Sequence, residues 1–250
     1  MLTPTEDKSN DLADVINRYR PELKRFEDVY RHIHTNPELS GQEEQTAKIA
    51  SDHLQSLGFE VHTKIGGHGV AGVLRNGTGP TILLRADMDA LPVEEQTGLP
   101  YASTRRTKDE TGADKPVMHA CGHDTHVATL MAAATLLQCA RDHWAGTLIC
   151  IFQPAEEHLD GAQAMLDDGL YDKIPKPELV LAQHVMRMRA GTVNLRAGPL
   201  LTAADAFDVR IFGRGGHGSA PHTTIDPIVV GASVVMRLQT IVSREVAPGK

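Results

Sequence analysis

Apolar side chains recur every three or four positions over residues 12–34, with Pro21 as an interruption. This spacing is typical of amphipathic helices, and residues 43–57 repeat it. Ser40 and Glu43 stand three residues apart just before or at the start of the second stretch, which is the spacing of a capping box at a helix N-terminus. We therefore predict helices over most of the first 57 residues.

Short apolar runs alternate with helical stripes between residues 59 and 185. β-Branched and aliphatic residues bounded by glycine and proline predict strands at 59–65, 69–76, 81–89, 146–153 and 178–185. Helical stripes predict helices just after residue 124 and over 161–170. This alternation is typical of an α/β fold, here an α/β/α sandwich on a mainly parallel sheet.

The pattern changes near residue 200. Strict alternation of apolar and polar residues within 204–216 predicts a strand with one solvated face, and an amphipathic helix follows with Pro227 in its first turn. We expect a catalytic domain over 1–198 and the start of a smaller α+β domain over 199–250. One strand and one helix cannot cover their own apolar faces, so we expect this second domain to be incomplete.

Charge and composition argue against two classes of partner. The net charge is −7 and no basic stripe is present, so a nucleic acid is not an expected partner. No run approaches the roughly 18 apolar residues that a membrane span requires. The three cysteines are irregularly spaced and the N-terminus lacks an apolar signal-peptide core, so we expect a soluble, cytoplasmic protein.

Chemically reactive side chains gather where the predicted strands end and just before the helix that follows residue 124. Open α/β sheets place their functional sites at the carboxyl ends of strands, which makes this clustering informative. The residues concerned are Asp87, Asp89, Cys121, His123, Asp124, Glu156, Glu157 and His184.

Cys121 and His123 lie two residues apart, so a loop can turn both side chains toward one centre. A thiolate, imidazoles and a carboxylate together suit zinc or a similar divalent ion. A thiolate can also bridge two ions, and paired ions are common in hydrolytic sites. The alternative is that Cys121 is a small buried side chain in a polar turn. The neighbouring histidines favour the metal site.

Glu156 and Glu157 follow a buried strand as an adjacent pair. Because neighbouring side chains diverge, we expect them to make different contacts. One can ligate a metal ion while the other stays free to take a proton from water near the ion. Two solvated surface glutamates are the alternative reading.

Four glycines surround His217 in the segment 213–218 and permit close backbone approach to a ligand. A histidine on such a loop can donate to a developing oxyanion. A phosphate-binding loop is disfavoured because no Lys-Ser/Thr pair follows the glycines, while a turn with incidental histidines stays open. His126 can chelate a metal or fill a core or supporting position, and His34 is expected at the surface or behind the site.

Several segments together resemble a known family. From about residue 25 to the end, the chain resembles the dinuclear-metal aminoacylase and carboxypeptidase family. The closest branch is the amidohydrolase branch, which holds hippurate hydrolase, auxin-conjugate hydrolases and N-acyl-amino-acid deacylases. The segments that carry the resemblance, in family order, are RHIHTNPELSGQE, LRADMDALPVEE, MHACGHDTHVATLMAAATLL, IFQPAEE, QHV and GRGGHGSAPHTTIDP.

The resemblance implies two divalent metal ions, with zinc or manganese ahead of cobalt or nickel. Cys121 resembles the bridging thiolate of the family. His123 and His184 look like the other ligands of one ion, and Glu157 looks like a ligand of the second ion.

The resemblance also implies catalytic roles. Glu156 looks like the general base that activates the bridging water, and Asp89 like the carboxylate that orients a neighbour in the metal site. His217, on the smaller lid domain, resembles the histidine that holds the substrate or the oxyanion, often from the partner subunit.

The implied reaction is hydrolysis of the amide bond of N-acyl amino acids or amino-acid conjugates by a metal-activated water. Two alternatives are a dipeptidase or carboxypeptidase with a peptide-like substrate, and a catalytically impaired metal-binding fragment. Family chains continue through the rest of the lid to a last histidine ligand, so we expect this chain to be C-terminally truncated relative to the family. A homodimer through the lid is compatible with the resemblance.

Overall fold

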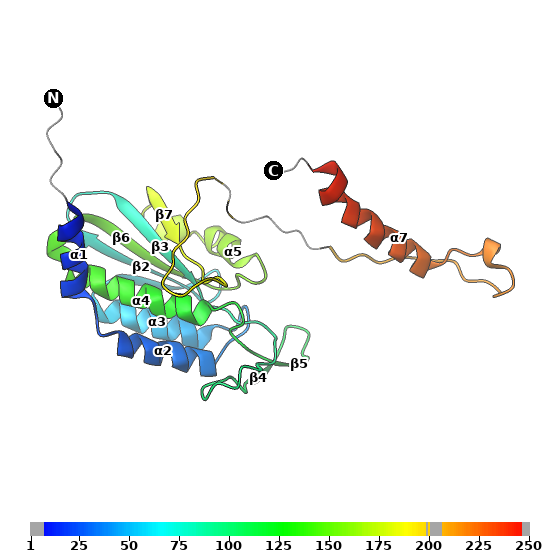
Figure 1. Ribbon diagram of the computed structural model, residues 1–250, viewed down its shortest axis with the longest axis horizontal. Helices are drawn as coiled ribbons and strands as arrows, with labels where there is room; N and C mark the ends of the chain where they lie inside the picture. The colour runs from blue at the N-terminus through cyan, green and yellow to red at the C-terminus, as the bar shows by residue number, and fades with distance from the viewer. Residues whose placement is uncertain (1–7, 199, 201–206, 247–250) are drawn as a thin grey trace, which may run out of the picture. The chain divides into compact units, whose positions relative to one another are not determined.

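The computed structural model describes residues 8–198, 200 and 207–246. The chain divides into two compact units, Met1–Met188 and Arg189–Lys250 (Figure 1). The first unit contains a five-stranded sheet with helices packed on it, and the second contains one long helix. The assignment of the two units as catalytic domain and lid stays a prediction.

The sheet of the first unit has the strand order β1-β2-β6-β3-β7. β2 pairs antiparallel with β1 and β6, whereas β3 pairs parallel with β6 and β7. All strands except β2 therefore run in one direction, and the predicted α/β class with a mainly parallel sheet is confirmed. The strands are β1 (Glu60–Ile65), β2 (Gly69–Asn76), β3 (Thr81–Asp87), β6 (Gly146–Gln153) and β7 (Leu179–Ala182).

Helices cover both faces of this sheet. On one face α2, α3 and α4 pack together over the larger apolar core, and α1 contacts α4 (Figure 1). On the other face α5 and α6 cover a smaller core. The helices are α1 (Lys8–Tyr19), α2 (Leu23–Thr35), α3 (Glu44–Ser56), α4 (His123–Cys139), α5 (Gly161–Asp167) and α6 (Leu170–Lys173).

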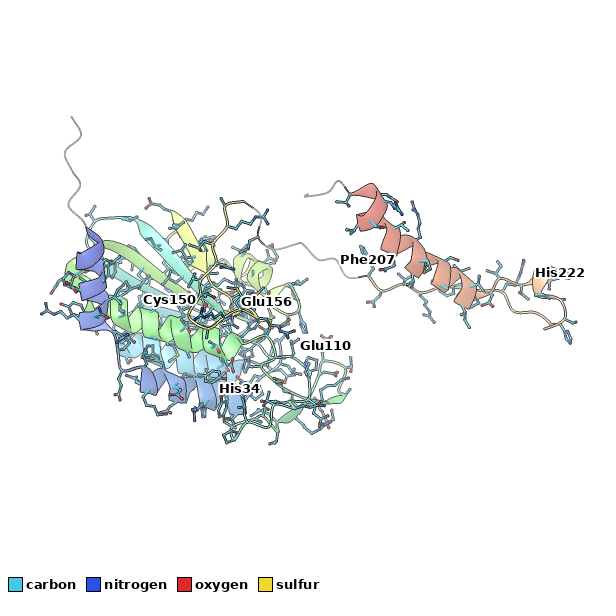
Figure 2. All side chains as sticks on the ribbon, in the orientation of Figure 1. His34, Glu110, Cys150, Glu156, Phe207 and His222 are labelled. Atoms are coloured by element: carbon cyan, nitrogen blue, oxygen red, sulfur yellow. The ribbon has the colours of Figure 1, made fainter. Side chains whose placement is uncertain are left out.

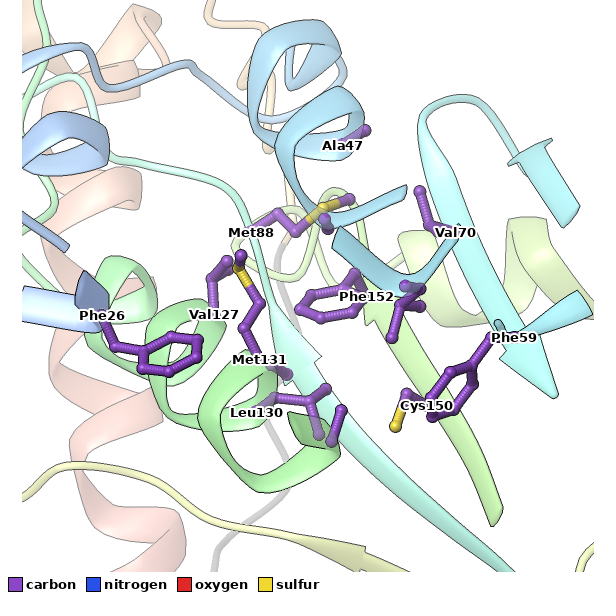
Figure 3. Close-up of a cluster of buried hydrophobic side chains, with 14 of the residues drawn as sticks. Phe26, Ala47, Phe59, Val70, Met88, Val127, Leu130, Met131, Cys150 and Phe152 are labelled. Atoms are coloured by element: carbon purple, nitrogen blue, oxygen red, sulfur yellow. The ribbon is translucent and has the colours of Figure 1, made fainter. Parts of the chain in front are cut away.

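The larger core joins the helical layer to the middle of the sheet. Phe26 from α2 and Met131 from α4 belong to the same cluster as Cys150 and Phe152 from β6 (Figure 3). β6 is buried along almost its whole length because helices cover both of its faces. This explains why its sequence is a continuous apolar run rather than an alternating one.

A short polar hairpin was not foreseen from the sequence. β4 (Arg106–Lys108) pairs antiparallel with β5 (Asp114–Pro116). Both strands are rich in charged residues and lie at the surface, so they lack the apolar pattern that indicates a strand.

The second unit is dominated by α7 (Pro227–Thr240), which continues as a π-helical turn, Ile241–Glu245. The predicted helix is confirmed, and the Asp226 side chain accepts a hydrogen bond from the Ile228 N–H at 2.8 Å as its N-cap. The predicted strand is not formed over 207–213, where the described residues make no β-pairing. Within the described part of this segment, Arg214 forms an isolated antiparallel bridge with Ile225. Residues 204–206 of that prediction lie outside the described residues.

Within the described ranges, no helix combines the length and apolarity needed to cross a membrane.

The contact between α3 and β2 gives a direct test of the core. Leu54 is fully buried, and a Cβ atom built on Gly72 would lie 2.6 Å from its Cδ1 atom, so the two elements pack closely. We expect Leu54→Ala to lower the free energy of unfolding by about 2–5 kcal/mol in urea titrations, because it leaves a cavity. Leu166→Ala, at a position 45% exposed, should change it by about 0.5 kcal/mol or less. Equal losses in both variants would contradict this packing.

Candidate metal centre

The candidate residues of the first unit converge at one edge of the sheet. β6, β3 and β7 are neighbouring parallel strands, so their carboxyl ends meet there. Asp89 follows β3, Glu156 and Glu157 follow β6, and His184 follows β7. α4 begins at His123 beside them. The predicted clustering at strand ends is therefore what the structure shows.

Two groups of ligand atoms share His123. Cys121, His123 and His184 offer ligand atoms within 4.8 Å of one another, as do His123, Glu156 and Glu157. The Cys121 Sγ atom lies 3.5 Å from His184 Nε2, and His123 Nε2 lies 3.8 Å from Glu156 Oε2. The structure thus brings together all four predicted metal ligands and the predicted base.

The two glutamates do not diverge as far as expected. Both carboxylates reach the same imidazole, although adjacent residues of an extended strand point to opposite sides. The expectation assumed extended backbone, whereas both glutamates lie in a turn over 156–159, in which the Leu159 N–H donates to the Glu156 carbonyl oxygen at 2.8 Å. Ala155, just before this turn, adopts a left-handed conformation with φ of 47°.

His123 is oriented with one nitrogen free. Its Nδ1 atom lies 2.9 Å from the Asp89 carbonyl oxygen and 3.1 Å from Asp89 Oδ1. Both are acceptors, so Nδ1 carries a proton, and Nε2 is the nitrogen that can offer a lone pair to a metal ion. Nε2 is buried and has no hydrogen-bond partner within the described part of the chain. Metal-binding histidines commonly show this arrangement, with the second nitrogen held by a carboxylate or carbonyl.

The donor set fits a divalent cation on further grounds. Glu157 Oε1 is also buried without a partner among the described residues. Burial raises the pKa of Glu157, and burial together with the Glu157 and Glu156 carboxylates raises the pKa of Cys121 to about 12. Both shifts favour the protonated groups, and a bound cation would reverse them by stabilising the thiolate and the carboxylate.

Asp89 connects three segments through one carboxylate. Its Oδ1 atom faces His123, while Oδ2 accepts hydrogen bonds from the Ser40 hydroxyl at 2.7 Å and from the Glu157 backbone N–H at 2.9 Å. Burial favours the protonated form, but the hydrogen bonds from His123, Glu157 and Ser40 outweigh it and hold the pKa of Asp89 below its usual value. The predicted orienting role has its geometric counterpart in the contact with His123.

His126 packs against His184. The Val185 backbone N–H donates to His126 Nε2 at 3.0 Å, and the rings of His126 and His184 are 4.5 Å apart. Asp87, His123 and His126 also form a group that can hold a metal. In that group His126 Nε2 is already engaged by Val185, which favours a supporting role over chelation.

His184 itself is exposed and directs one nitrogen at the thiol. Its Nδ1–H donates to the Val185 carbonyl oxygen at 2.7 Å, so Nε2 presents its lone pair toward Cys121 Sγ. These two side chains come from segments 63 residues apart in the sequence.

The predicted capping box is wrong. Ser40 donates to Asp89, and Glu43 Oε1 accepts hydrogen bonds from the Gly41 N–H at 2.9 Å and the Ala155 N–H at 2.8 Å. The first turn of α3 is instead capped by Glu38, which was not singled out from the sequence. Glu38, Ser40 and Glu43 all lie in RHIHTNPELSGQE, one of the segments that resemble the family, and this was the available sequence signal for their importance.

His217 belongs to the second unit. Its Nδ1 atom accepts a hydrogen bond from the Ser219 N–H at 3.2 Å and lies 2.8 Å from the Ser219 hydroxyl, and its side chain is exposed. Its role in holding substrate or oxyanion stays a prediction.

Comparison with known proteins identifies the family. Residues 83–242 match the model of the peptidase family M20/M25/M40. This chain belongs to that family. The hippurate hydrolase of Campylobacter jejuni is 43% identical over 89% of this chain and 56% of its own length. The N-acetyl-L-cysteine deacetylase of Bacillus subtilis is 42% identical over 90% of this chain and 52% of its own.

Solved structures agree with the assignment of this M20 chain. The Bacillus subtilis YXEP protein, a dinuclear metal-binding peptidase of the M20 family, is 36% identical with a TM-score of 0.56, over 65% of this chain and 43% of that one. A structure from methicillin-resistant Staphylococcus aureus, described as an aminohydrolase, is 35% identical with a TM-score of 0.75, over 94% of this chain and 60% of that one. The resemblance inferred from the sequence is confirmed. The chain spans about half the length of the curated relatives it matches.

A buried histidine lies near the candidate metal ligands of this M20 chain. His34 on α2, labelled in Figure 2, lies with Nδ1 2.6 Å from Asp124 Oδ2 and Nε2 3.1 Å from Glu95 Oε1. Both nitrogens face carboxylates, so both donate. The hydrogen bond to Asp124 raises the pKa of His34 to about 9, against burial and with help from Glu95. The ion pair ties α2 to the first turn of α4, next to His123.

The raised pKa of His34 predicts a pH-dependent stability. Its contribution is fully present below the ordinary histidine pKa of 6.5 and is lost as pH rises through about 9, because the folded state then gives up the bound proton. We expect His34→Gln to remove this loss when urea unfolding is measured in chelator between pH 6 and 10. His32→Gln, at an exposed position on the same helix, should keep the profile of the parent. Parallel profiles for His34→Gln and the parent would rule the ion pair out.

Proposed function

We propose that this chain carries the machinery for metal-dependent hydrolysis of the amide bond in N-acyl amino acids or amino-acid conjugates. The observation that carries the proposal is a pair of ligand groups that share His123, one with Cys121 and His184 and the other with Glu156 and Glu157. Within the described residues, His123 Nε2 and Glu157 Oε1 are buried there without a hydrogen-bond partner. Relatives named as hippurate hydrolase and N-acetyl-L-cysteine deacetylase support this substrate class.

In the proposed mechanism Cys121, His123, His184 and Glu157 would hold two divalent ions. When bound, such ions supply positive charge that makes a water more acidic and polarises an amide carbonyl. Zinc and manganese are our first candidates for this sulfur, nitrogen and oxygen donor set, and cobalt or nickel are others.

Glu156 acts as the general base in this proposal. Its side chain is 32% exposed, which leaves the carboxylate open to water and substrate, and it lies 3.8 Å from His123 Nε2. It takes the proton from the attacking water and passes it to the leaving amine. Asp89 keeps the His123 ring in position through Nδ1, so that Nε2 remains available.

A second candidate function is a carboxypeptidase with the same site. Similarity to a relative favours this function: the thermostable carboxypeptidase 2 of Saccharolobus solfataricus is 40% identical over 94% of this chain and 59% of its own length. Initial rates on a panel of N-acyl amino acids and dipeptides separate the two candidates. The proposal has three further parts. His217 holds the substrate or the oxyanion, the chain dimerises through the second unit, and the protein is located in the cytoplasm.

Glu156→Gln tests the proposed base. The substitution keeps the size of the side chain but removes its basicity, so we expect kcat to fall by about 10²–10⁴-fold with little change in KM. The ion content should stay that of the parent, as measured by elemental mass spectrometry on the same samples. A variant with the kcat of the parent would exclude Glu156 as the base.

Cys121→Ser tests the proposed ligands, with Cys139→Ser as the matched control. Cys139 is an exposed cysteine at the end of α4. After gel filtration in the presence of zinc or manganese, we expect two ions per chain in the parent and the control, as in a dinuclear centre. Cys121→Ser should retain one or none, because a hydroxyl is a weaker ligand than a thiolate. Two ions retained in Cys121→Ser would remove this residue from the ligand set.

A further inference from the structure

The turn after β6 has a backbone that its own sequence does not favour. Ala155 has a φ of 47°, a left-handed conformation that non-glycine residues rarely adopt. Such conformations persist where surrounding interactions hold them, and they concentrate at functional sites. The turn leads directly into Glu156 and Glu157, so whatever holds it also sets the direction of both carboxylates.

A buried carboxylate from a distant segment holds the start of this turn. Glu43 is fully buried, and its Oε1 atom accepts the Ala155 N–H at 2.8 Å across 112 residues of sequence. The same oxygen accepts the Gly41 N–H at 2.9 Å, which fixes the carboxylate relative to its own loop.

A second carboxylate holds the end of the turn. Asp89 Oδ2 accepts the Glu157 N–H at 2.9 Å and the Ser40 hydroxyl at 2.7 Å. The N–H groups of Ala155 and Glu157, the residues before and after Glu156, therefore both donate to carboxylates from other segments. Ser40 and Glu43 lie in one short loop before α3, so that loop supports both anchors.

We propose that Glu43 is a positioning residue for the Glu156–Glu157 pair. The hydrogen bonds of its Oε1 atom come from the backbone amides of Gly41 and Ala155. It acts through the backbone of Ala155, which it keeps in the left-handed conformation from which the chain enters the turn that carries both glutamates. The catalytic consequence rests on the proposed function. The structural consequence, which is that Glu43 holds the Ala155 amide by a hydrogen bond, is independent of the proposed function.

Capping of α3 does not account for Glu43. The side chain that accepts the first-turn amides is Glu38, which receives the Gln45 N–H at 3.0 Å and the Thr46 N–H at 2.9 Å. Glu38 is also a buried carboxylate, five residues earlier, and none of its side-chain hydrogen bonds reaches the turn after β6. Glu38→Ala is therefore a matched control for the loss of a buried carboxylate next to α3.

The first experiment is hydrogen–deuterium exchange of the whole chain without added metal. We expect Glu43→Ala to speed exchange in the segment 153–158 by about tenfold or more, because the Ala155 amide loses its acceptor. Glu38→Ala should speed exchange at 44–47 and leave 153–158 as in the parent. Glu43→Gln keeps an acceptor oxygen and should restore much of the protection.

The second experiment uses Co²⁺ as the probe. We expect Glu43→Ala to weaken the binding of one of two ions by about 10–100-fold, as is typical when a group behind a ligand is removed. The thiolate-to-cobalt absorption band should persist, because Cys121 lies on another segment. Glu38→Ala should bind both ions as the parent does.

The outcomes separate this inference from the proposed function. Unchanged exchange at 153–158 in Glu43→Ala, or an equal increase in Glu38→Ala, overturns the positioning role. Faster exchange with unchanged Co²⁺ binding also overturns it, since the ligands would then not depend on the turn. A parent chain that binds no Co²⁺ refutes the metal proposal, while exchange still decides whether Glu43 holds the turn. If Glu43→Ala does not fold, Glu43→Asp withdraws the oxygen by one methylene and serves in its place.

Discussion

The carboxylate of Asp89 is the contact on which the arrangement of the site depends. It is almost fully buried and ionised, so it requires several donors, and it receives them from three segments that are remote in sequence. His123 brings the start of α4, Ser40 the loop before α3, and Glu157 the turn after β6. Because one carboxylate satisfies all three, His123 and Glu157 are held in position relative to the sheet to which Asp89 is attached.

The surroundings of Asp89 also explain why a bound cation would stabilise the site. Once Asp89 has oriented His123, the remaining nitrogen of that ring points into a region that contains the Cys121 thiol and two carboxylates. Buried lone pairs without donors destabilise a folded protein. A divalent ion would satisfy them together, so ion binding and stability of this edge of the sheet are thermodynamically linked.

Much of this architecture could be predicted from the sequence. β2 and β6 coincide with the apolar runs that predicted them, because strands buried between helices need such runs. The polar β4–β5 hairpin lacked that signal, and the reversed direction of β2 cannot be read from composition. The candidate ligands could be selected from their chemistry at strand ends and before α4, and the structure brings them together. Ser40 and Glu43 were assigned to a cap because their spacing is local and their partners are distant.

The position of the two glutamates shows why such support is needed. On an extended strand Glu156 and Glu157 would face opposite sides of the sheet, and only one of them could reach His123. Both reach it because they lie in the turn 156–159 after β6, which the chain enters through Ala155 in a conformation that alanine does not favour by itself. Hydrogen bonds from outside the turn must therefore stabilise it. Glu43 and Asp89 provide these bonds from segments that no local sequence pattern connects to it.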